Sequence, residues 1–507
     1  MLSRYEGHPG RSLAFVIFGG TGDLTHRKLL PALYNLMTEQ LLPADYIVYC
    51  IGRREKNDSI YRAEAAESIR KHSRSSIDDS CLNSFLNHVH YHRLEFRRDE
   101  TGYDSLYNRL NTELTDFEKP VAKLFFLAVA PEYFSVVIAH LHAHKLIEKG
   151  NPDHRVMVEK PFGSDLASAR ELNDGIIEVL AESQIFRIDH YLGKEMIQNI
   201  MAIRFGNSLF EPLWNHYYID NIQITSTEKL GVESRGGYYE QVGILKDMLQ
   251  NHLLQMLAII AMEPPVDLSA ESVRDEKVKV LRTLRFINSD LAGSGIIAGQ
   301  YAAGNIDGRP VLPYRAEENV DFESNTLTYV ALKAAIDNFR WGGVPIYIRA
   351  GKRLDRQRTQ IVIEFKRLPG ISFYEEFKTQ SPNLLVIEVQ PAEGMYFQIN
   401  SKRPGNEFAM ERIELNYCQN CRFQGNVPEA YERLILEAFR GNSSLFTRWD
   451  ELEHSWTFIE GIEKLLLEKP VTLPNYAAGS RGPETADELI EADGRHWWEI
   501  DIDNGIS

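Results

Sequence analysis

The chain has 507 residues, too many for one ordinary hydrophobic core, so we expect two domains or one large one. Its 43% hydrophobic and 25% charged residues are typical of a globular protein. The formal net charge of −16 argues against sequence-independent binding of DNA or RNA, which needs a basic surface. No apolar stretch approaches the length of a membrane span. We therefore expect a cytoplasmic protein without nucleic-acid or membrane partners.

The four cysteines are too few for a disulfide framework in a chain of this length. Cys418 and Cys421 form a single C-x-x-C pair, which is half of a zinc site, and no second pair exists. A redox role and a chance spacing both remain open for this pair. We expect no metal site.

The first part of the chain alternates apolar strands with helical patterns. Apolar runs at residues 13–20, 46–52, 123–130 and 155–159 predict strands, and residues 26–37 predict a helix. The polar tract at residues 55–80 predicts an exposed helix. This alternation predicts a Rossmann-type α/β domain with a doubly wound parallel sheet at residues 12–187, after an extension at residues 1–11.

A glycine-rich loop joins the first strand to the first helix. Glycines permit a tight turn and let backbone N–H groups approach a pyrophosphate at the start of a helix. The pattern is not a complete G-x-G-x-x-G, because Thr25 stands at the third glycine position. The strand before the loop and the helix after it favour a dinucleotide site, formed by Gly19, Gly20, Thr21, Gly22, Asp23 and Leu24.

Arginine rather than an acid follows the second strand. NAD enzymes usually place a carboxylate there to bind the ribose hydroxyls. Here Arg53 and Arg54 come first, and a guanidinium suits a 2′-phosphate. Thr21 lies where its hydroxyl can also reach that phosphate. We therefore expect NADP as cofactor; the alternative is that both arginines are simply solvated.

Two further motifs carry polar side chains at strand ends. Lys160 precedes a proline in Val-Glu-Lys-Pro-Phe-Gly, which fixes its backbone direction near the edge where parallel sheets bind ligands. Asp-His-Tyr-Leu-Gly-Lys-Glu, residues 189–195, places three hydrogen-bond donors, His190, Tyr191 and Lys194, at the start of a predicted helix. That composition is typical of a phosphate pocket. The alternatives are a surface lysine and a charged helix start in water.

The second part of the chain changes character. A helix to about residue 205, a strand at residues 221–227 and a long helix from about 239 to 262 precede a series of strands beyond residue 325. Strands without intervening helices predict an α+β C-terminal domain with a large, mainly antiparallel sheet, at residues 188–507.

The long helix contains Asp247 and His252 among apolar residues. A histidine in such a position is more often a satisfied core residue than a catalytic one. Residues five apart on a regular α-helix point about 140° apart, so these two should not share a face. Either a site wraps around the helix, or a π-bulge aligns the two side chains.

Five motifs occur in one order along the chain: GGTGDL, EKPFG, DHYLGKE, KDMLQNH and RAGKRL. Together they resemble the glucose-6-phosphate dehydrogenase family from about residue 12 onward. The resemblance implies oxidation of glucose 6-phosphate to 6-phosphoglucono-δ-lactone with NADP and without metal, as the first step of the oxidative pentose phosphate pathway. It also implies a homodimer or homotetramer assembled through the large sheet.

The resemblance assigns roles to individual residues. His252 is the catalytic base and Asp189 its partner; Arg53 selects NADP, and Lys160 contacts the substrate near the nicotinamide. The remaining substrate-binding residues are His190, Tyr191 and Lys194 for the phosphate, and Glu228, Asp247 and Lys352. The family commonly has a cation where this chain has Gln357, so either a flanking arginine replaces it or phosphate binding is weaker. Gln390 matches a family glutamine, but a polar strand end explains it equally well.

Two rival functions remain. The E-K-P turn also occurs in glucose–fructose oxidoreductases and inositol dehydrogenases, so a dehydrogenase of an unphosphorylated sugar is one alternative. It would not need the cluster of His190, Tyr191 and Lys194. A silent nucleotide-binding regulator is the other, and it would be expected to lack His252 or Asp189; both are present.

Overall fold

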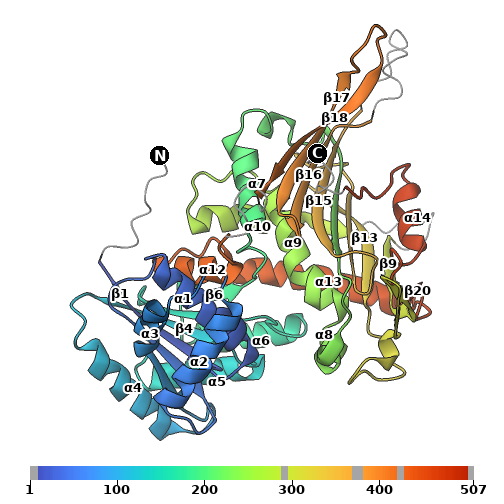
Figure 1. Cartoon of the computed structure of the whole chain (residues 1–507). Helices are drawn as coiled ribbons and strands as arrows, with labels where there is room; N and C mark the ends of the chain where they lie inside the picture. Colours follow the sequence, from blue (N-terminus) through green and yellow to red (C-terminus); the bar gives the residue numbers. More distant parts are fainter. Residues whose placement is uncertain (1–9, 287–294, 368–380, 420–426, 501–507) are drawn as a thin grey trace. The chain divides into compact units, whose positions relative to one another are not determined.

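The computed structural model describes residues 10–286, 295–367, 381–419 and 427–500 (Figure 1). The chain divides into two compact units. The first unit comprises residues 1–193, 265–275 and 426–453, and the second comprises residues 194–264, 276–425 and 454–507. The sequence placed the domain boundary close by, after residue 187. The sequence analysis assigned residues 265–275 and 426–453 to the second domain, whereas in the structure both segments belong to the first unit.

A parallel sheet forms the centre of the first unit. Its strands lie in the order β3-β2-β1-β4-β5-β6, all parallel, with β19 added antiparallel to β6. Every residue of β1 and β2 is buried, as the continuous apolar runs predict. The strands are β1 (Ser12–Phe18), β2 (Tyr46–Gly52), β3 (Val89–Arg93), β4 (Val121–Leu127), β5 (His154–Val158), β6 (Ile185–Ile188) and β19 (Phe446–Thr447).

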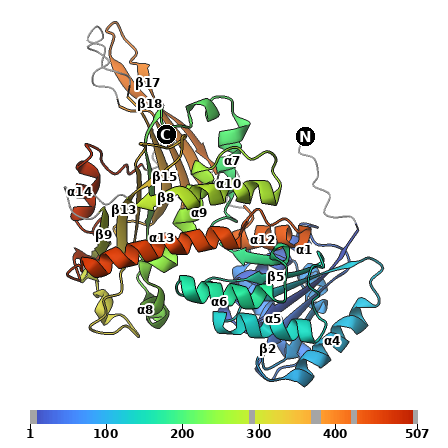
Figure 2. The ribbon, with the colours of Figure 1, turned by 180° about the vertical axis from the view of Figure 1, so that it is seen from behind.

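Helices cover both faces of this sheet, which confirms the doubly wound fold (Figures 1 and 2). One face carries α1 (Leu30–Thr38), α2 (Asp58–His72) and α3 (Asp79–Asn87), with α12 (Ala430–Arg440) beside α1. The other carries α4 (Glu100–Leu114), α5 (Phe134–Ala143) and α6 (Leu166–Ile177). The polar tract predicted as one helix forms α2 and the start of α3. Asn57 and Asp78 each accept an N–H bond from the first turn that follows, so each starts a separate helix.

The strand order determines where this unit can bind a ligand. The chain runs outward from β1 to β3 and then returns to β4, which pairs with the other edge of β1. The crossovers on the two sides of this point lie on opposite faces of the sheet. The carboxyl ends of β1 and β4 therefore border a crevice, the usual binding position in such folds.

The second unit is built on a nine-stranded sheet in the order β18-β17-β16-β15-β7-β14-β13-β8, with β9 also paired to β13. All neighbours are antiparallel except β7 and β14, which confirms the mainly antiparallel sheet. The strands are β7 (Ile219–Thr227), β8 (Leu284–Phe286), β9 (Ile296–Gly299), β13 (Tyr329–Ile336), β14 (Ile346–Gly351), β15 (Arg358–Phe365), β16 (Leu384–Gln390), β17 (Gly394–Lys402) and β18 (Met410–Cys418). Two small sheets pair β10 (Tyr301–Ala302) with β20 (Tyr476–Ala477), and β11 (Gly304–Ile306) with β12 (Arg309–Val311).

The helices of the second unit include one irregular segment. The long helix expected at about 239–262 is three pieces: α8 (Gly236–Ile244), a π-helix (Leu245–Leu253) and α9 (Leu254–Ala261). The other helices are α7 (Glu195–Gly206), α10 (Ala270–Thr283), α13 (Trp449–Glu468) and α14 (Thr485–Glu491), of which α10 and α13 include residues of both units. Short 3-10 helices lie at Pro131–Tyr133, Glu182–Gln184, Glu211–Leu213, Glu233–Arg235 and Tyr314–Ala316. Among the described residues no helix has the length and apolar character to cross a membrane.

Candidate active site

The glycine loop fits tightly between two strands of the first unit. Gly19 has a φ of 91°, and the N–H groups of Gly19 and Gly20 donate to the carbonyl of Ile51 at 3.0 and 2.7 Å. A Cβ added to Gly19 would lie 2.1 Å from the carbonyl oxygen of Ala128, and one on Gly20 would lie 2.8 Å from Cβ of Cys50. The loop can therefore reach the ends of β2 and β4 only without side chains, which positions the following helix start at the crevice beside β1.

The absence of the third glycine has a structural reason. Thr25 is fully buried, and its hydroxyl donates to the carbonyl of Gly19 at 2.9 Å. This bond closes the loop from the helix side. Thr25 begins a π-helix at Thr25–Leu29 that continues into α1. The threonine therefore stabilises the loop where a third glycine would have allowed close packing.

Arg53 and Thr21 lie on the same rim of the sheet. Arg53 comes directly after β2 and is exposed. Among the described residues it has no ion-pair partner, so its guanidinium is available to a ligand phosphate. A Cβ added to the neighbouring Gly52 would lie 3.1 Å from Cγ2 of Thr21, which places the Thr21 side chain beside the end of β2. This arrangement fits a dinucleotide with a 2′-phosphate.

The end of β5 carries a carboxyl group with an unusual proton affinity. Glu159 follows β5 directly, and the hydroxyl of Tyr431 donates to its Oε1 at 2.8 Å. Burial raises the pKa of Glu159 from 4.5 to about 7, although the Tyr431 bond and Lys160 act in the opposite direction. Lys160 is half-buried next to it, before a cis peptide bond to Pro161.

This pKa predicts a pH-dependent stability. The folded protein holds a proton on Glu159 that the unfolded chain releases above about pH 4.5. The contribution of Glu159 to the free energy of unfolding is therefore lost as the pH rises from about 4.5 toward 7. A shift of this size corresponds to at most about 3 kcal/mol of unfolding free energy. We expect the free energy of unfolding of Glu159→Gln, measured by urea unfolding and expressed relative to the wild type, to be higher at about pH 8 than at about pH 5. The exposed Glu171→Gln control should show no such trend, and a difference that does not change with pH would contradict the assignment.

The Asp-His-Tyr-Leu-Gly motif forms a tight turn after β6. Asp189 is buried, with 3% of its surface exposed, and its Oδ1 accepts the N–H of Tyr191 at 2.9 Å. The rings of His190 and Tyr191 meet edge to face, 5.1 Å apart. A Cβ on Gly193 would lie 2.9 Å from the carbonyl oxygen of Ala430, so α12 leaves no room for a side chain there. The carboxylate of Asp189 is thus held by the backbone of its own turn.

Lys194 stands at the N-cap of α7 and belongs to the second unit. Its Nζ donates to Oε1 of Gln390, whose amide donates in turn to Oγ1 of Thr359 at 3.1 Å. The sequence left Gln390 out of the site, since a polar strand end explained it equally well. The structure gives it a specific contact, in which it orients the ammonium of Lys194.

Three predicted substrate residues come together in the second unit. β7 and β14 are parallel neighbours, with Thr227 paired to Gly351, so the residues that follow, Glu228 and Lys352, lie side by side. Nζ of Lys352 contacts Oε2 of Glu228 and lies 3.6 Å from Oδ2 of Asp247. Lys352 is 8% exposed, so two carboxylates hold a nearly desolvated ammonium in place.

Tyr239 is part of the same cluster, and the sequence gave it no role. Nζ of Lys352 lies 5.1 Å from the centre of its ring, within range of a cation–π contact. The hydroxyl is deeply buried, and burial raises its pKa well above the usual value, so Tyr239 stays neutral. Its position in Gly-Gly-Tyr-Tyr, which forms the first turn of α8, was the available signal.

The π-helix confirms one of the two explanations for Asp247 and His252. Both residues lie within Leu245–Leu253, where bonds join residues five apart instead of four. That spacing puts residues five apart nearly above one another, so both side chains lie on the same side of the helix. His252 is 1% exposed. The wider turn aligns a buried imidazole with the carboxylate that contacts Lys352.

The region around Gln357 contains charged neighbours with acidic partners. Gln357 is exposed. Nε of Arg356 lies 3.3 Å from Asp355 and its Nη2 lies 3.7 Å from Glu499, while Nε of Arg358 lies 4.0 Å from Glu388. Both alternatives for the family's cation therefore stay predictions: a flanking arginine replaces it, or phosphate binding is weaker. Cys418 ends β18, and Cys421 lies outside the described residues.

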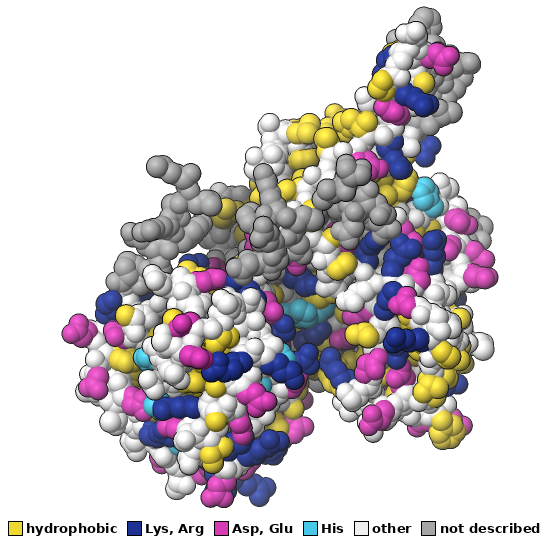
Figure 3. Space-filling view, viewed as in Figure 1, with side chains coloured by type: hydrophobic (Ala, Val, Ile, Leu, Met, Phe, Trp, Pro, Cys, Tyr) yellow, Lys and Arg dark blue, Asp and Glu magenta, His cyan; other side chains and the backbone are white. Residues whose placement is uncertain are grey.

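The two units thus bring together separate subsets of the predicted site. In the first, the glycine loop, Arg53, Lys160 and Asp189 all follow strands of one parallel sheet, and therefore lie at its carboxyl edge. In the second, Glu228, Asp247 and Lys352 make direct contacts. Figure 3 shows acidic and basic side chains intermixed on the visible surface of the first unit. The lysines and arginines of the predicted site therefore attract an anionic ligand only locally, because the chain as a whole carries a net charge of −16.

Comparisons with known proteins show which family the chain belongs to. The model of the glucose-6-phosphate dehydrogenase NAD binding domain matches residues 16–199, and that of the C-terminal domain matches residues 201–498. Glucose-6-phosphate 1-dehydrogenase of Bacillus subtilis is 45% identical over 96% of this chain and 98% of its own, and that of Chlamydia pneumoniae is 44% identical over 95% of both. A solved structure of glucose-6-phosphate dehydrogenase in complex with glucose 6-phosphate superposes with a TM-score of 0.88 at 36% identity, over 97% of this chain and 99% of that one. The chain belongs to the glucose-6-phosphate dehydrogenase family.

Proposed function

We propose that this chain oxidises glucose 6-phosphate at C1 to 6-phosphoglucono-δ-lactone with hydride transfer to NADP, using His252 as the base. Family membership over nearly the whole chain supports the reaction. The observation that carries the residue assignment is the π-helix, which aligns His252 with Asp247 while Asp247 and Glu228 contact Lys352. An ordinary core histidine would not require this irregular backbone.

The reaction needs a base for the C1 hydroxyl proton. Imidazole is well suited, because its ordinary pKa lies near neutral pH. His252 accepts the proton, and the carboxylate of Asp189 orients the ring and stabilises the charge that forms. NADP, when bound, supplies the hydride acceptor at C4 of its nicotinamide. The proton and the hydride together account for both hydrogens that leave the sugar.

The substrate's two ends would be held by different residues. His190, Tyr191 and Lys194 donate to the 6-phosphate, with Lys194 positioned by Gln390. Glu228 and Asp247 accept bonds from sugar hydroxyls, and Lys352 donates to the sugar. Since Lys352 already contacts both carboxylates, this part of the site is preorganised before substrate binds.

The cofactor would lie along the carboxyl edge of the parallel sheet. The helix start at Asp23 and Leu24 faces the pyrophosphate, with Gly19, Gly20 and Gly22 keeping side chains out of its path. Arg53 and Thr21 bind the 2′-phosphate, and Lys160 lies near the nicotinamide and the substrate.

The direct test follows NADPH absorbance with glucose 6-phosphate, with glucose and without sugar. We expect rapid NADPH formation with the phosphorylated sugar alone. Equal rates with both sugars would favour the dehydrogenase of an unphosphorylated sugar. No reduction with either sugar would favour the silent regulator.

Substitution of Lys194 tests the phosphate pocket. Lys194→Ala removes a charge-assisted bond worth about 1.5–3 kcal/mol, so KM for glucose 6-phosphate should rise about 10- to 150-fold while kcat stays within about threefold. Gln390→Ala should raise KM less, because it leaves the ammonium in place but unoriented. Lys279→Ala, an exposed residue of α10, is the control. A loss confined to kcat would contradict the role of Lys194.

We also propose a homodimer or homotetramer that works in the cytoplasm. A reaction between two phosphorylated metabolites that do not cross membranes suits that compartment. The exposed Leu415 on β18 and Phe408 nearby, with 55% of each surface accessible, support assembly through the large sheet. Light scattering at the working concentration should give twice or four times the 58.1 kDa chain mass.

A further inference from the structure

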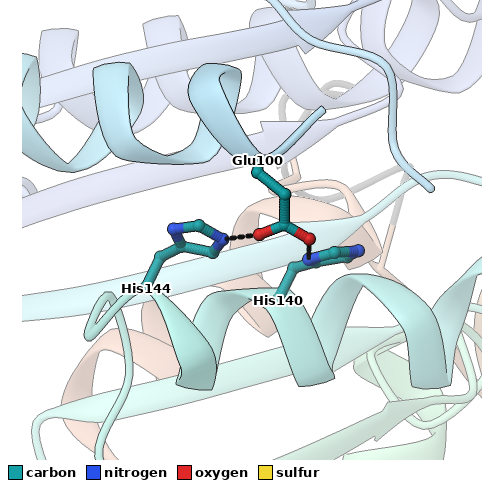
Figure 4. Close-up of side chains that lie close together, drawn as sticks. All are labelled: Glu100, His140 and His144. Carbon is teal, nitrogen blue, oxygen red and sulfur yellow. Dashed lines mark hydrogen bonds and ion pairs between the residues drawn. The ribbon is translucent and has the colours of Figure 1, made fainter. Parts of the chain in front are cut away.

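Two histidines and a glutamate converge on the outer helices of the first unit (Figure 4). Glu100 begins α4, and His140 and His144 lie four apart at the end of α5. Oε2 of Glu100 lies 2.7 Å from Nε2 of His144, and its Oε1 lies 3.6 Å from Nδ1 of His140. One ligand atom from each of the three residues lies within 4.8 Å of the other two. None of them belongs to the proposed active site.

The outer nitrogens of both rings have their own acceptors. Nδ1 of His144 lies 2.7 Å from Oδ1 of Asp104, and Nε2 of His140 lies 3.1 Å from the carbonyl oxygen of Arg97. A carbonyl can only accept, so the proton of neutral His140 lies on Nε2. Nδ1 and Nε2 of His144 lie equally close to a carboxylate, at 2.7 Å from Asp104 and from Glu100, so neutral His144 can carry its proton on either nitrogen. In one tautomer the proton lies on Nδ1 and is donated to Asp104. Both remaining lone pairs then face the carboxylate of Glu100.

Lone pairs that face a carboxylate repel it, so this centre calls for a cation. A proton on His144 is one solution: burial lowers the pKa of His144, but the hydrogen bonds to Asp104 and Glu100 outweigh it and raise the pKa overall. A metal ion is the other. Metal-bound histidines usually donate their outer N–H to a carboxylate or a backbone carbonyl, and both rings here are arranged in that way.

We propose that Glu100, His140 and His144 bind a Zn²⁺ ion, with water as the fourth ligand. Two imidazoles and a carboxylate suit zinc, and histidines four apart on one helix face are a common zinc-binding pair. Zinc bonds of about 2.0–2.1 Å put neighbouring tetrahedral ligands about 3.3 Å apart, between the two separations measured to Glu100. The ion would link α4 to α5, and its role would be to stabilise the nucleotide-binding unit.

The surroundings hold the imidazoles still while leaving an entry for the ion. Both rings stack on Tyr103, with centroids 4.7 and 5.4 Å away, and the Tyr103 hydroxyl donates to the carbonyl of Phe96 at 3.0 Å. The histidine side chains are 16% and 10% exposed, whereas that of Glu100 is 66% exposed. The two imidazoles are therefore held in place by packing, whereas Glu100 is accessible to solvent and to an entering ion. The sequence led us to expect no metal site, although the spacing His-Leu-His-Ala-His was visible.

Isothermal titration of the full-length chain, without any added histidine tag, with Zn²⁺ after chelator treatment tests the proposal. We expect one equivalent to bind and to raise Tm, and Co²⁺ to give the visible absorption of a tetrahedral site. His140→Ala, His144→Ala and Glu100→Gln should each weaken binding at least tenfold, and Asp104→Asn about 10- to 100-fold. Glu100→Gln keeps the size of the side chain, which separates ligand loss from misfolding.

His142→Ala provides the matched control, because His142 lies on the same helical segment but is exposed and outside the cluster. It should bind zinc like the wild type. The proposal is overturned if the wild type binds no zinc, if His140→Ala and His144→Ala bind as tightly as the wild type, or if His142→Ala loses as much affinity as they do. Circular dichroism of each variant in the absence of metal confirms that the fold is intact. If the proposal is overturned, protonated His144 is the cation that balances Glu100 at this centre.

Discussion

Replacing His252 with asparagine is expected to lower kcat about 10²- to 10⁴-fold while KM for glucose 6-phosphate changes less than about threefold. Removal of a general base affects the transition state, whereas the sugar phosphate is held by other groups. Asparagine is small enough for this buried position and can still form hydrogen bonds. The π-helix and the contact between Asp247 and Lys352 should therefore persist.

Steady-state kinetics with saturating NADP measure this split directly. His496→Asn is a suitable control, because that histidine lies in the second unit and is exposed. Among the ring contacts of the described residues, its ring meets only that of Trp498, in a tilted geometry. An unchanged kcat in His252→Asn would remove His252 from the mechanism. A large rise in KM with normal kcat would make it a binding residue.

Replacing Arg53 with alanine should raise KM for NADP about 10- to 150-fold and leave KM for NAD nearly unchanged. The expected loss corresponds to about 1.5–3 kcal/mol for charge-assisted bonds to a phosphate that NAD lacks. Arg53 is exposed and has no ion-pair partner among the described residues, so its removal should leave the fold unaffected.

Arg93→Ala is the matched control, since Arg93 ends the next strand of the sheet and is also exposed. It should leave the kinetics with both cofactors unchanged. Equal losses for NADP and NAD in Arg53→Ala would show that Arg53 binds a feature common to both cofactors. If Arg93→Ala loses as much affinity for NADP as Arg53→Ala does, the loss comes from removing a positive charge from the surface and not from a specific contact of Arg53 with the phosphate.

The central strands of both sheets could be predicted because most of them are continuous apolar runs in the sequence. Strands such as β1 and β2 are buried at every position and so appear as apolar runs. The elements that the sequence analysis did not predict include the strands β3, β6, β8 and β9 and the helices α4, α6, α10, α12 and α13. α12 carries Glu432, which is 1% exposed and pairs with Arg74 of the first unit. A buried acid with a partner hundreds of residues away gives no local signal.

The sequence predicted which residues belong to the site more fully than it predicted how those residues are arranged. Each motif named the chemistry at one strand end, but the meeting of Glu228 and Lys352 depends on β7 and β14 being parallel neighbours within an otherwise antiparallel sheet. The π-helix could be proposed, because two polar residues five apart on an apolar helix conflict with regular geometry. Gln390 and Tyr239 were not assigned, because only their contacts with lysines distinguish them.

The transfer of deuterium from C1 of labelled glucose 6-phosphate tests the central claim most directly. With NADP and C1-deuterated substrate, mass spectrometry should find one deuterium in each reduced cofactor formed and none in the lactone product. The same label in glucose should give far slower transfer, because the phosphate contacts are lost. Unlabelled reduced cofactor, deuterium retained in the sugar product, or equally fast transfer from glucose would contradict hydride transfer from C1 of glucose 6-phosphate by this site.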